Sequence, residues 1–168
     1  MIDVVTIVIV AGTFLIAGTV KGVVGHGLPM VSLALLTVAI GLLEAMSLLL
    51  VPSFVTNFWQ AIVGGNGKIV LRRIWVLLVA ATVTVWVGAA ALTRVDLGLL
   101  SALLGVLLVV YSSINLSGYR LTLTQRREIW LGPLVGLGNG LLAGMTGPFA
   151  VPGVMFLQAI GLPRDMLI

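Results

Sequence analysis

The chain has 168 residues, of which 60% are hydrophobic and only 8% are charged. A soluble domain carries about 25% charged residues, and a soluble fold of this length could not hide so much apolar surface. The net charge of +4 comes from a few basic residues without interleaved aromatics, which argues against nucleic acid as a partner, and the lack of cysteine excludes disulfides and thiolate sites. The composition predicts an all-α, multi-pass protein whose main partner is the lipid bilayer.

The charged residues divide the chain into apolar runs, and a bilayer span needs roughly 20 apolar residues. The first run predicts a helix over 4–20, followed by a glycine-rich break over 21–29 and a short apolar run over 30–40. That short run favours a half-helix that re-enters the membrane, with a crossing segment as the alternative. A second full helix is expected over 43–63, with Glu44 in its first turn.

Three further spans are expected, over 74–93, 97–116 and 129–144. A second Gly/Pro break follows, and a last short apolar run ends at Ile160. The basic loops 68–73 and 120–127 are separated by two spans, so they lie on one side of the membrane. By the positive-inside rule that side is the cytoplasm, which places the protein in the cell (plasma or inner) membrane.

The spacing G-x3-G-x2-G occurs twice, at Gly18, Gly22 and Gly25 and again at Gly140, Gly144 and Gly147. The tetrapeptide at 39–42 recurs at 159–162, and Pro29 has a counterpart in Pro152. This ordered set of matches predicts an internal duplication.

The duplication predicts two segments of unequal length. A first repeat over 1–120 would hold about four transmembrane helices and a re-entrant half-helix at 28–41, and 121–168 would be an incomplete second repeat. The chain is therefore expected to be truncated. The repeats would be parallel if the short segment re-enters the membrane, and inverted if it crosses.

A broken helix frees backbone N–H and C=O groups, which must face protein or a wet cavity. The N-terminal N–H groups of the half-helix after a break suit an anion, and glycine lets a ligand approach closely. Paired Gly/Pro-interrupted helices are typical of transporter binding sites. We therefore predict substrate binding by Lys21, Gly22, Gly25, His26, Gly27 and Pro29 at the first break, and by Gly144, Thr146, Gly147, Pro148 and Pro152 at the second.

Each of these residues also has a structural interpretation. Lys21 either contacts an anionic substrate or extends to the interface, and His26 either carries a proton or satisfies freed carbonyl groups. The polar residues within apolar runs are expected to bond neighbouring helices more often than ligands: Asn57, Asn139, Thr146 and Gln158. One histidine and no cysteine make a poor metal site, and no nucleophile–base pair is evident, so no cofactor and no enzyme activity are expected.

The segments 22–29 and 144–152 resemble the paired glycine-rich motifs of the sulfite exporter TauE/SafE family, also described as toluene-sulfonate uptake permeases. This resemblance implies a duplicated four-helix unit and a secondary permease for sulfite, sulfonates or related organosulfur anions, driven by ion gradients without ATP. His26 departs from the pattern, because many members have glycine there.

The partners implied are a small anionic substrate and a coupling proton or ion, while a homo-oligomer is left open. The alternatives are a permease for another small metabolite or ion and a non-transporting membrane scaffold.

Overall fold

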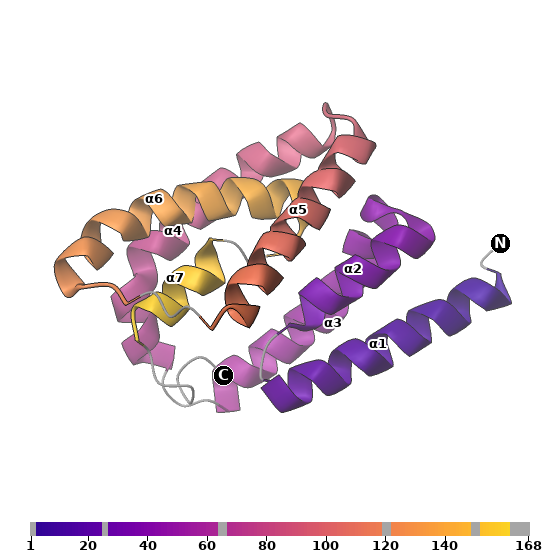
Figure 1. Cartoon of the computed structure of the whole chain (residues 1–168), viewed down its shortest axis with the longest axis horizontal. Helices are drawn as coiled ribbons and strands as arrows, with labels where there is room; N and C mark the ends of the chain where they lie inside the picture. Colours follow the sequence, from indigo (N-terminus) through magenta and orange to yellow (C-terminus); the bar gives the residue numbers. More distant parts are fainter. Residues whose placement is uncertain (1–2, 25–26, 64–66, 119–121, 149–151, 162–168) are drawn as a thin grey trace. The chain divides into compact units, whose positions relative to one another are not determined.

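The computed structural model describes residues 3–24, 27–63, 67–118, 122–148 and 152–161. In these ranges all regular structure is helical (Figure 1), which confirms the all-α prediction. The helices are α1 (Val4–Val24), α2 (Leu28–Ile40), α3 (Leu42–Val63), α4 (Gly67–Leu92), α5 (Leu97–Leu116), α6 (Gln125–Thr146) and α7 (Gly153–Ala159).

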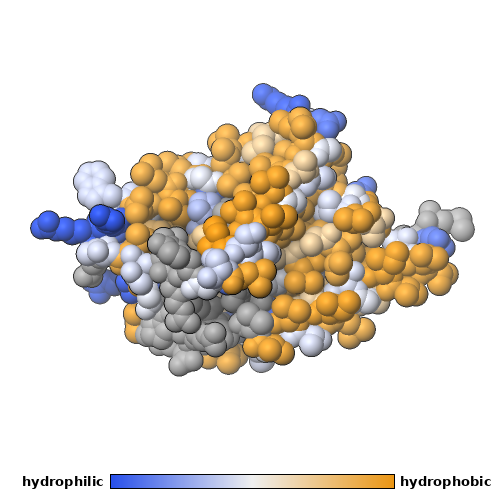
Figure 2. Space-filling view, in the orientation of Figure 1, coloured by the Kyte–Doolittle hydropathy of each residue, from blue (hydrophilic) through white to orange (hydrophobic). Residues whose placement is uncertain are grey.

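Five of the described helices, α1, α3, α4, α5 and α6, are long and apolar enough to cross a membrane. Much of their apolar surface is exposed on the chain itself, and Figure 2 shows this surface in orange over most of the visible face. Such exposure is expected where lipid is the solvent. With 13 residues, α2 rises only about 20 Å, less than the hydrocarbon core needs. Its length agrees with a half-helix, and re-entry itself stays a prediction.

The predicted boundaries differ from the observed ones mainly where basic residues lie. The segment 68–73 was expected to be a loop, and this prediction is wrong, because α4 begins at Gly67 and contains all of it. Arg126 and Arg127 likewise lie in the first turn of α6. Lysine and arginine are good helix formers whose long side chains reach the interface, so they mark a membrane edge without ending a helix.

Residue contacts divide the chain into two compact units, the first made of α1, α2 and α3. In this unit α2 packs against both α1 and α3. Leu33 and Leu36 of α2 are completely buried, as are Ala17 of α1 and Ala45 of α3. Between α2 and α3 the chain turns at Gly41, whose φ of 94° suits glycine, and Glu44 lies in the first turn of α3 as expected.

The second unit contains α4 to α7, and its main contact is between α4 and α6. Gly140 and Gly144 of α6 have no room for a side chain: a Cβ atom at Gly140 would collide with the carbonyl oxygen of Ala81, and one at Gly144 with that of Val85. A Cβ atom at Gly88 of α4 would likewise collide with the carbonyl oxygen of Leu141. Small residues at four-residue spacing let membrane helices approach backbone to backbone, so these glycines have a packing role.

Candidate functional site

The most unusual polar group of the first unit is the side chain of Lys21, in the last turn of α1. Its Nζ atom donates hydrogen bonds to Oδ1 of Asn57 at 2.6 Å and to Oγ1 of Thr56 at 3.0 Å, both on α3. Lys21 is only 9% exposed. Thr56 donates its own hydroxyl hydrogen to the carbonyl oxygen of Pro52 at 2.8 Å, which leaves its oxygen lone pairs for Lys21.

Within the described part of the chain, no carboxylate balances the charge of Lys21. Among the residues that the structure describes, the salt bridge formed is between Arg73 and Glu128, in the second unit. Both acceptors of Lys21 are neutral, and they occupy two of its three N–H donors. A buried cation in a membrane segment is costly without a counter-ion, and such residues commonly mark a substrate or ion path.

The start of α2 lies beside the last turns of α1. A Cβ atom at Gly27 would lie 3.6 Å from Cγ1 of Val20, the neighbour of Lys21 in α1. Gly27 precedes α2 with a φ of 105°, no side chain caps the helix, and Pro29 occupies its first turn. The positive end of the α2 dipole is thus close to the α1 turn that carries Lys21.

Two serine hydroxyls add to the polarity of this unit. Oγ of Ser32 on α2 and Oγ of Ser53 on α3 are buried, and neither has a hydrogen-bond partner in the described ranges. Thr56 and Asn57 follow Ser53 by three and four residues, which places the three side chains on one face of α3. We define the Lys21 cluster as Lys21, Thr56 and Asn57. Sequence reasoning found Lys21 but missed Thr56 and the serines, although the spacing of polar residues at 53, 56 and 57 was a usable signal.

The structure accounts for the first-break residues unevenly. It brings Lys21, Gly27 and Pro29 into one region at the end of α1 and the start of α2. Gly22 lies within α1 and has open space where a side chain would be. The break between α1 and α2 is therefore shorter than the predicted 21–29. Gly25 and His26 lie outside the described residues.

The second break separates α6 from α7. Gly147 ends α6 with a φ of 94°, and Pro152 precedes α7. Thr146 is completely buried and donates its hydroxyl hydrogen to the carbonyl oxygen of Leu142 in its own helix, at 2.8 Å. Pro148 is also buried. Gly144 faces α4, so the structure explains it by helix packing, and its role in substrate binding stays a prediction.

Asn139 of α6 holds the start of α7. Its Oδ1 atom accepts a hydrogen bond of 2.9 Å from the backbone N–H of Gly153. The residue is 0% exposed, and its Nδ2 group has no hydrogen-bond partner among the residues that the structure describes. Asn139 thus connects two helices, as expected for a polar residue within an apolar run.

The other end of α7 is held by Arg73 of α4, a contact that sequence reasoning did not predict. Nε and Nη2 of Arg73 donate to the two carboxylate oxygens of Glu128 at 2.8 and 2.9 Å, and Nη2 also reaches the carbonyl oxygen of Ile160 at 3.0 Å. The backbone N–H of Leu123 donates to the carbonyl oxygen of Ala159 at 2.9 Å. The short helix is therefore fixed at both ends.

The glycines that flank the two short helices share a positive φ angle. Gly27 and Gly41 flank α2, and Gly147 and Gly161 flank the segment that contains α7; all four have positive φ. Gly147 follows Gly27 by 120 residues, and Gly161 follows Gly41 by the same interval. This regularity supports the predicted duplication, which stays a prediction, as do its bounds.

The described residues contain no group of three or more histidine, aspartate or glutamate side chains that could hold a metal ion. The polar groups present are instead a buried ammonium, hydroxyls, amides and a helix N-terminus. This combination suits a small anion rather than a cation.

Comparison with protein-family models gives a match over residues 10–166, to the family described as sulfite exporter TauE/SafE. No curated protein and no solved structure matches the chain. The family consists of transporters and not of enzymes. Because the match spans nearly the whole chain and five described helices can cross a bilayer, the chain is a multi-pass membrane protein that belongs to the sulfite exporter TauE/SafE family.

Proposed function

We propose that the protein moves sulfite, a sulfonate or a related small organosulfur anion across the cell membrane, and that the Lys21 cluster binds this anion. The observation that carries the proposal is the buried ammonium of Lys21, which has two neutral acceptors and no carboxylate partner among the described residues. The family match supports transport of this substrate class.

The chemistry of the cluster fits an oxygen-rich anion. The oxygen atoms of a sulfite or sulfonate group accept hydrogen bonds from several directions, and the strongest come from charged donors. The third N–H of Lys21 supplies such a donor. Because Oδ1 of Asn57 already accepts from Lys21, the amide nitrogen of Asn57 is a second donor on the same side chain.

Charge balance gives the anion a reason to bind here. An anion at Lys21 would form a neutral pair with the ammonium and remove the cost of an unbalanced buried charge. The start of α2 and the hydroxyls of Ser32 and Ser53 would add further polarity without a competing negative charge. The proposal includes a coupling proton or ion as the driving force, which the family resemblance implies.

We also propose that the basic starts of α4 and α6 lie on the cytoplasmic side. Lys68, Arg72 and Arg73 lie near one helix start, and Arg126 and Arg127 near the other. By contrast, the turn between α4 and α5 holds one arginine and one aspartate, Arg94 and Asp96. This asymmetry satisfies the positive-inside rule.

The test is uptake of radiolabelled sulfite, and separately of a radiolabelled alkylsulfonate, into vesicles that contain the purified full chain. We expect saturable flux for at least one anion, a loss of roughly tenfold or more in Lys21→Met, and partial retention in Lys21→Arg. Arg94→Gln, in the turn between α4 and α5, is the matched control and should behave as the unaltered protein.

Unaltered anion flux in Lys21→Met would contradict the assignment of the site. The absence of saturable flux for any small anion would contradict the transport proposal. Saturable flux of a cation or an uncharged metabolite in its place would support the alternative permease.

A further inference from the structure

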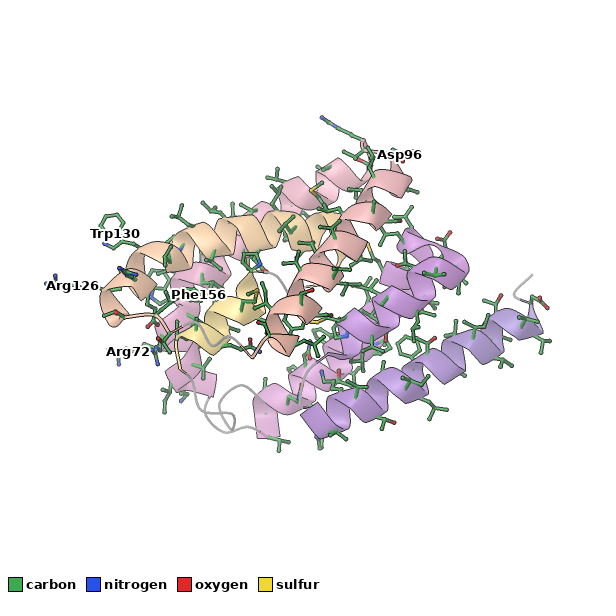
Figure 3. The ribbon with its side chains drawn as sticks, in the orientation of Figure 1. Arg72, Asp96, Arg126, Trp130 and Phe156 are labelled. Atoms are coloured by element: carbon green, nitrogen blue, oxygen red, sulfur yellow. The ribbon has the colours of Figure 1, made fainter. Side chains whose placement is uncertain are left out.

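One end of the second unit carries a concentration of positive charge that the proposed anion site does not use. The bidentate contact between Arg73 and Glu128 places the first turns of α4 and α6 side by side. Lys68 and Arg72 on α4 lie at this end together with Arg126 and Arg127 on α6. In Figure 3, Arg72 and Arg126 are seen at the same end of the unit, at the left.

Glu128 neutralises Arg73, and none of the other basic residues at this end has a carboxylate partner among the described residues. The patch therefore keeps an excess of positive charge after its own ion pair is formed. A patch of this kind attracts phosphate groups.

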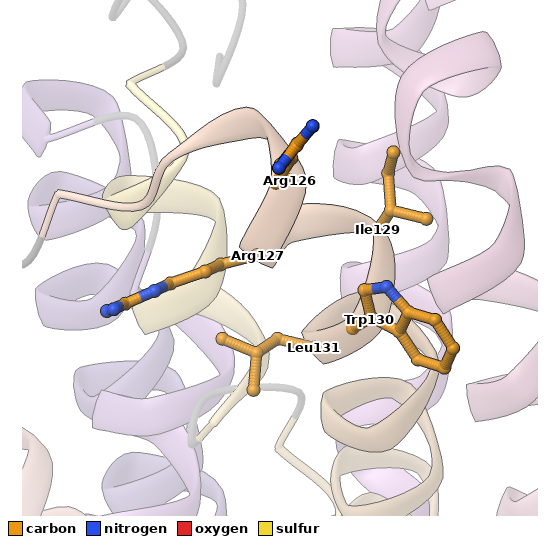
Figure 4. Close-up of a pocket in the computed structure, with 5 residues that line it drawn as sticks. All are labelled: Arg126, Arg127, Ile129, Trp130 and Leu131. Atoms are coloured by element: carbon orange, nitrogen blue, oxygen red, sulfur yellow. The ribbon is translucent and has the colours of Figure 1, made fainter.

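The patch also contains a groove with an apolar wall. Arg126, Arg127, Ile129, Trp130 and Leu131 line a depression of about 610 Å³ (Figure 4). Trp130 is 80% exposed and lies four residues after Arg126, on the same face of α6. Figure 3 shows Trp130 beside Arg126 on the outer side of the helix.

This pairing of an exposed indole with arginines occurs where α6 begins to cross the membrane. The part of α6 that is long and apolar enough to span a membrane runs from Arg126 to Thr146. Tryptophan prefers the level of the lipid headgroups, and arginine reaches the phosphates at that level. A soluble anion makes no apolar contacts with the exposed side chains of Ile129 and Trp130. A lipid brings both a phosphate for the arginines and acyl chains for these apolar side chains.

We propose that the groove formed by Arg126, Arg127 and Trp130 binds an anionic phospholipid, with the phosphodiester at the guanidinium group of Arg126, the charge of Arg127 adding to the attraction, and the glycerol and upper acyl chains against the indole. Planar guanidinium groups match phosphate oxygens better than ammonium groups do. Lys68 and Arg72 raise the positive potential around the groove. None of its residues belongs to the Lys21 cluster, so the lipid site goes beyond the proposed transport function.

The test measures quenching of Trp130 by brominated lipids. In a background with Trp59→Phe, Trp75→Phe and Trp86→Phe, all at exposed positions, Trp130 is the remaining tryptophan and is excited selectively. The full chain is placed in nanodiscs of phosphatidylcholine that contain a small fraction of either brominated phosphatidylglycerol or brominated phosphatidylcholine. We expect stronger quenching by the brominated phosphatidylglycerol, which would show selection of the anionic headgroup.

The arginines are then removed in the same background. Since each basic residue near a membrane surface contributes about 1 kcal/mol, Arg126→Gln should weaken the preference for the anionic lipid about fivefold, and the double change with Arg127→Gln about thirtyfold. Arg94→Gln, at the opposite end of α4, should leave the preference unchanged.

Equal quenching by the two brominated lipids in the protein with its arginines intact would overturn the proposal, and this comparison does not depend on any arginine variant. A preference that survives removal of both arginines would also overturn it. Displacement of the lipid by soluble glycerol phosphate would identify a site for free phosphate esters instead.

Discussion

The ammonium nitrogen of Lys21 lies 2.6 Å from the side-chain oxygen of Asn57, and the two residues are brought together from separate helices of the first unit. Lysine has the reach to cross from α1 to α3, and each of these helices packs mainly against α2. The contact therefore fixes how α1 is rotated relative to α3. A substrate anion that approached Lys21 would act on the same contact.

The first prediction concerns the coupling between these two side chains. Asn57→Leu removes one of the two acceptors of a buried ammonium, and it should lower the free energy of unfolding by about 1–3 kcal/mol. In the double variant with Lys21→Met the ammonium is gone, so the loss should be smaller than the sum of the two single losses. Unfolding in mixed detergent micelles, followed by circular dichroism, measures each value. Additive losses would show that the contact contributes nothing to stability.

The second prediction concerns the α4–α6 interface. Gly140→Ala places a methyl group against the carbonyl oxygen of Ala81, so the helices must separate, with a loss of about 1–3 kcal/mol in stability. Gly138 of the same helix has open space where a Cβ atom would lie, and Gly138→Ala is the matched control. Alanine should be neutral there, or stabilise the helix by up to about 1 kcal/mol. Equal losses in the two variants would show that helix propensity, and not packing, is being measured.

Much of the fold follows from hydropathy. The expected span over 97–116 agrees with α5, and the expected helix over 43–63 agrees with α3 to within one residue. Basic residues were less informative. A lysine or arginine sets the level of the membrane surface, but the hydrogen bonds of a helix continue through it. For this reason the start of α4 was placed too late.

The spacing of glycines in the sequence could not distinguish two physical reasons for the absence of a side chain. Close helix packing and close ligand approach both require the absence of a Cβ atom. Gly140 and Gly144 pack against α4, whereas Gly18 and Gly22, at the matching positions of the sequence pattern, have open space around them. Helix pairing distinguishes these cases, and pairing is not encoded in the spacing within one helix.

The candidate site was predicted in part for a similar reason. Lys21 was evident as a charge next to a break in an apolar run. Its partners Thr56 and Asn57 lie 35 and 36 residues away, and their side chains meet Lys21 only because both α1 and α3 pack against α2. The rotation of each helix about its own axis decides which polar side chains face one another, and one sequence does not determine that rotation.

The third prediction concerns the ion pair at the start of α6. Glu128 is only 10% exposed, so Arg73→Gln leaves a carboxylate with little access to water. Because the Arg73 side chain is 38% exposed and partly screened, we expect a coupling energy of about 1 kcal/mol in a double-mutant cycle with Glu128→Gln. Arg73→Lys should recover little of it, since lysine cannot form the bidentate contact.

The same unfolding measurement in micelles gives these energies. Added salt should reduce the coupling. Arg72→Gln, at the exposed neighbouring position, is the control and should change stability little. A coupling near zero at low salt would contradict a stabilising role for the pair.

The fourth prediction concerns the hydrogen bond by which Asn139 anchors the start of α7. Asn139→Leu keeps a side chain that branches at Cγ but removes the acceptor of the Gly153 N–H. A buried N–H group without a partner costs about 1–3 kcal/mol, so the start of α7 should open roughly fivefold to 150-fold more often. Hydrogen exchange followed by mass spectrometry should show faster exchange in the peptide that covers α7, while the middle of α4 stays protected.

Thr146→Val provides the matched control, because Thr146 is another fully buried polar residue of α6, and its hydroxyl bonds to the carbonyl oxygen of Leu142 in the same helix. Its removal should leave exchange in α7 unchanged. The contact of Arg73 with the carbonyl oxygen of Ile160 lies at the opposite end of α7, so the effect of Asn139→Leu should be largest at Gly153 and decrease toward Ala159. Uniform exchange along α7, or no change from the unaltered protein, would show that Asn139 does not anchor its start.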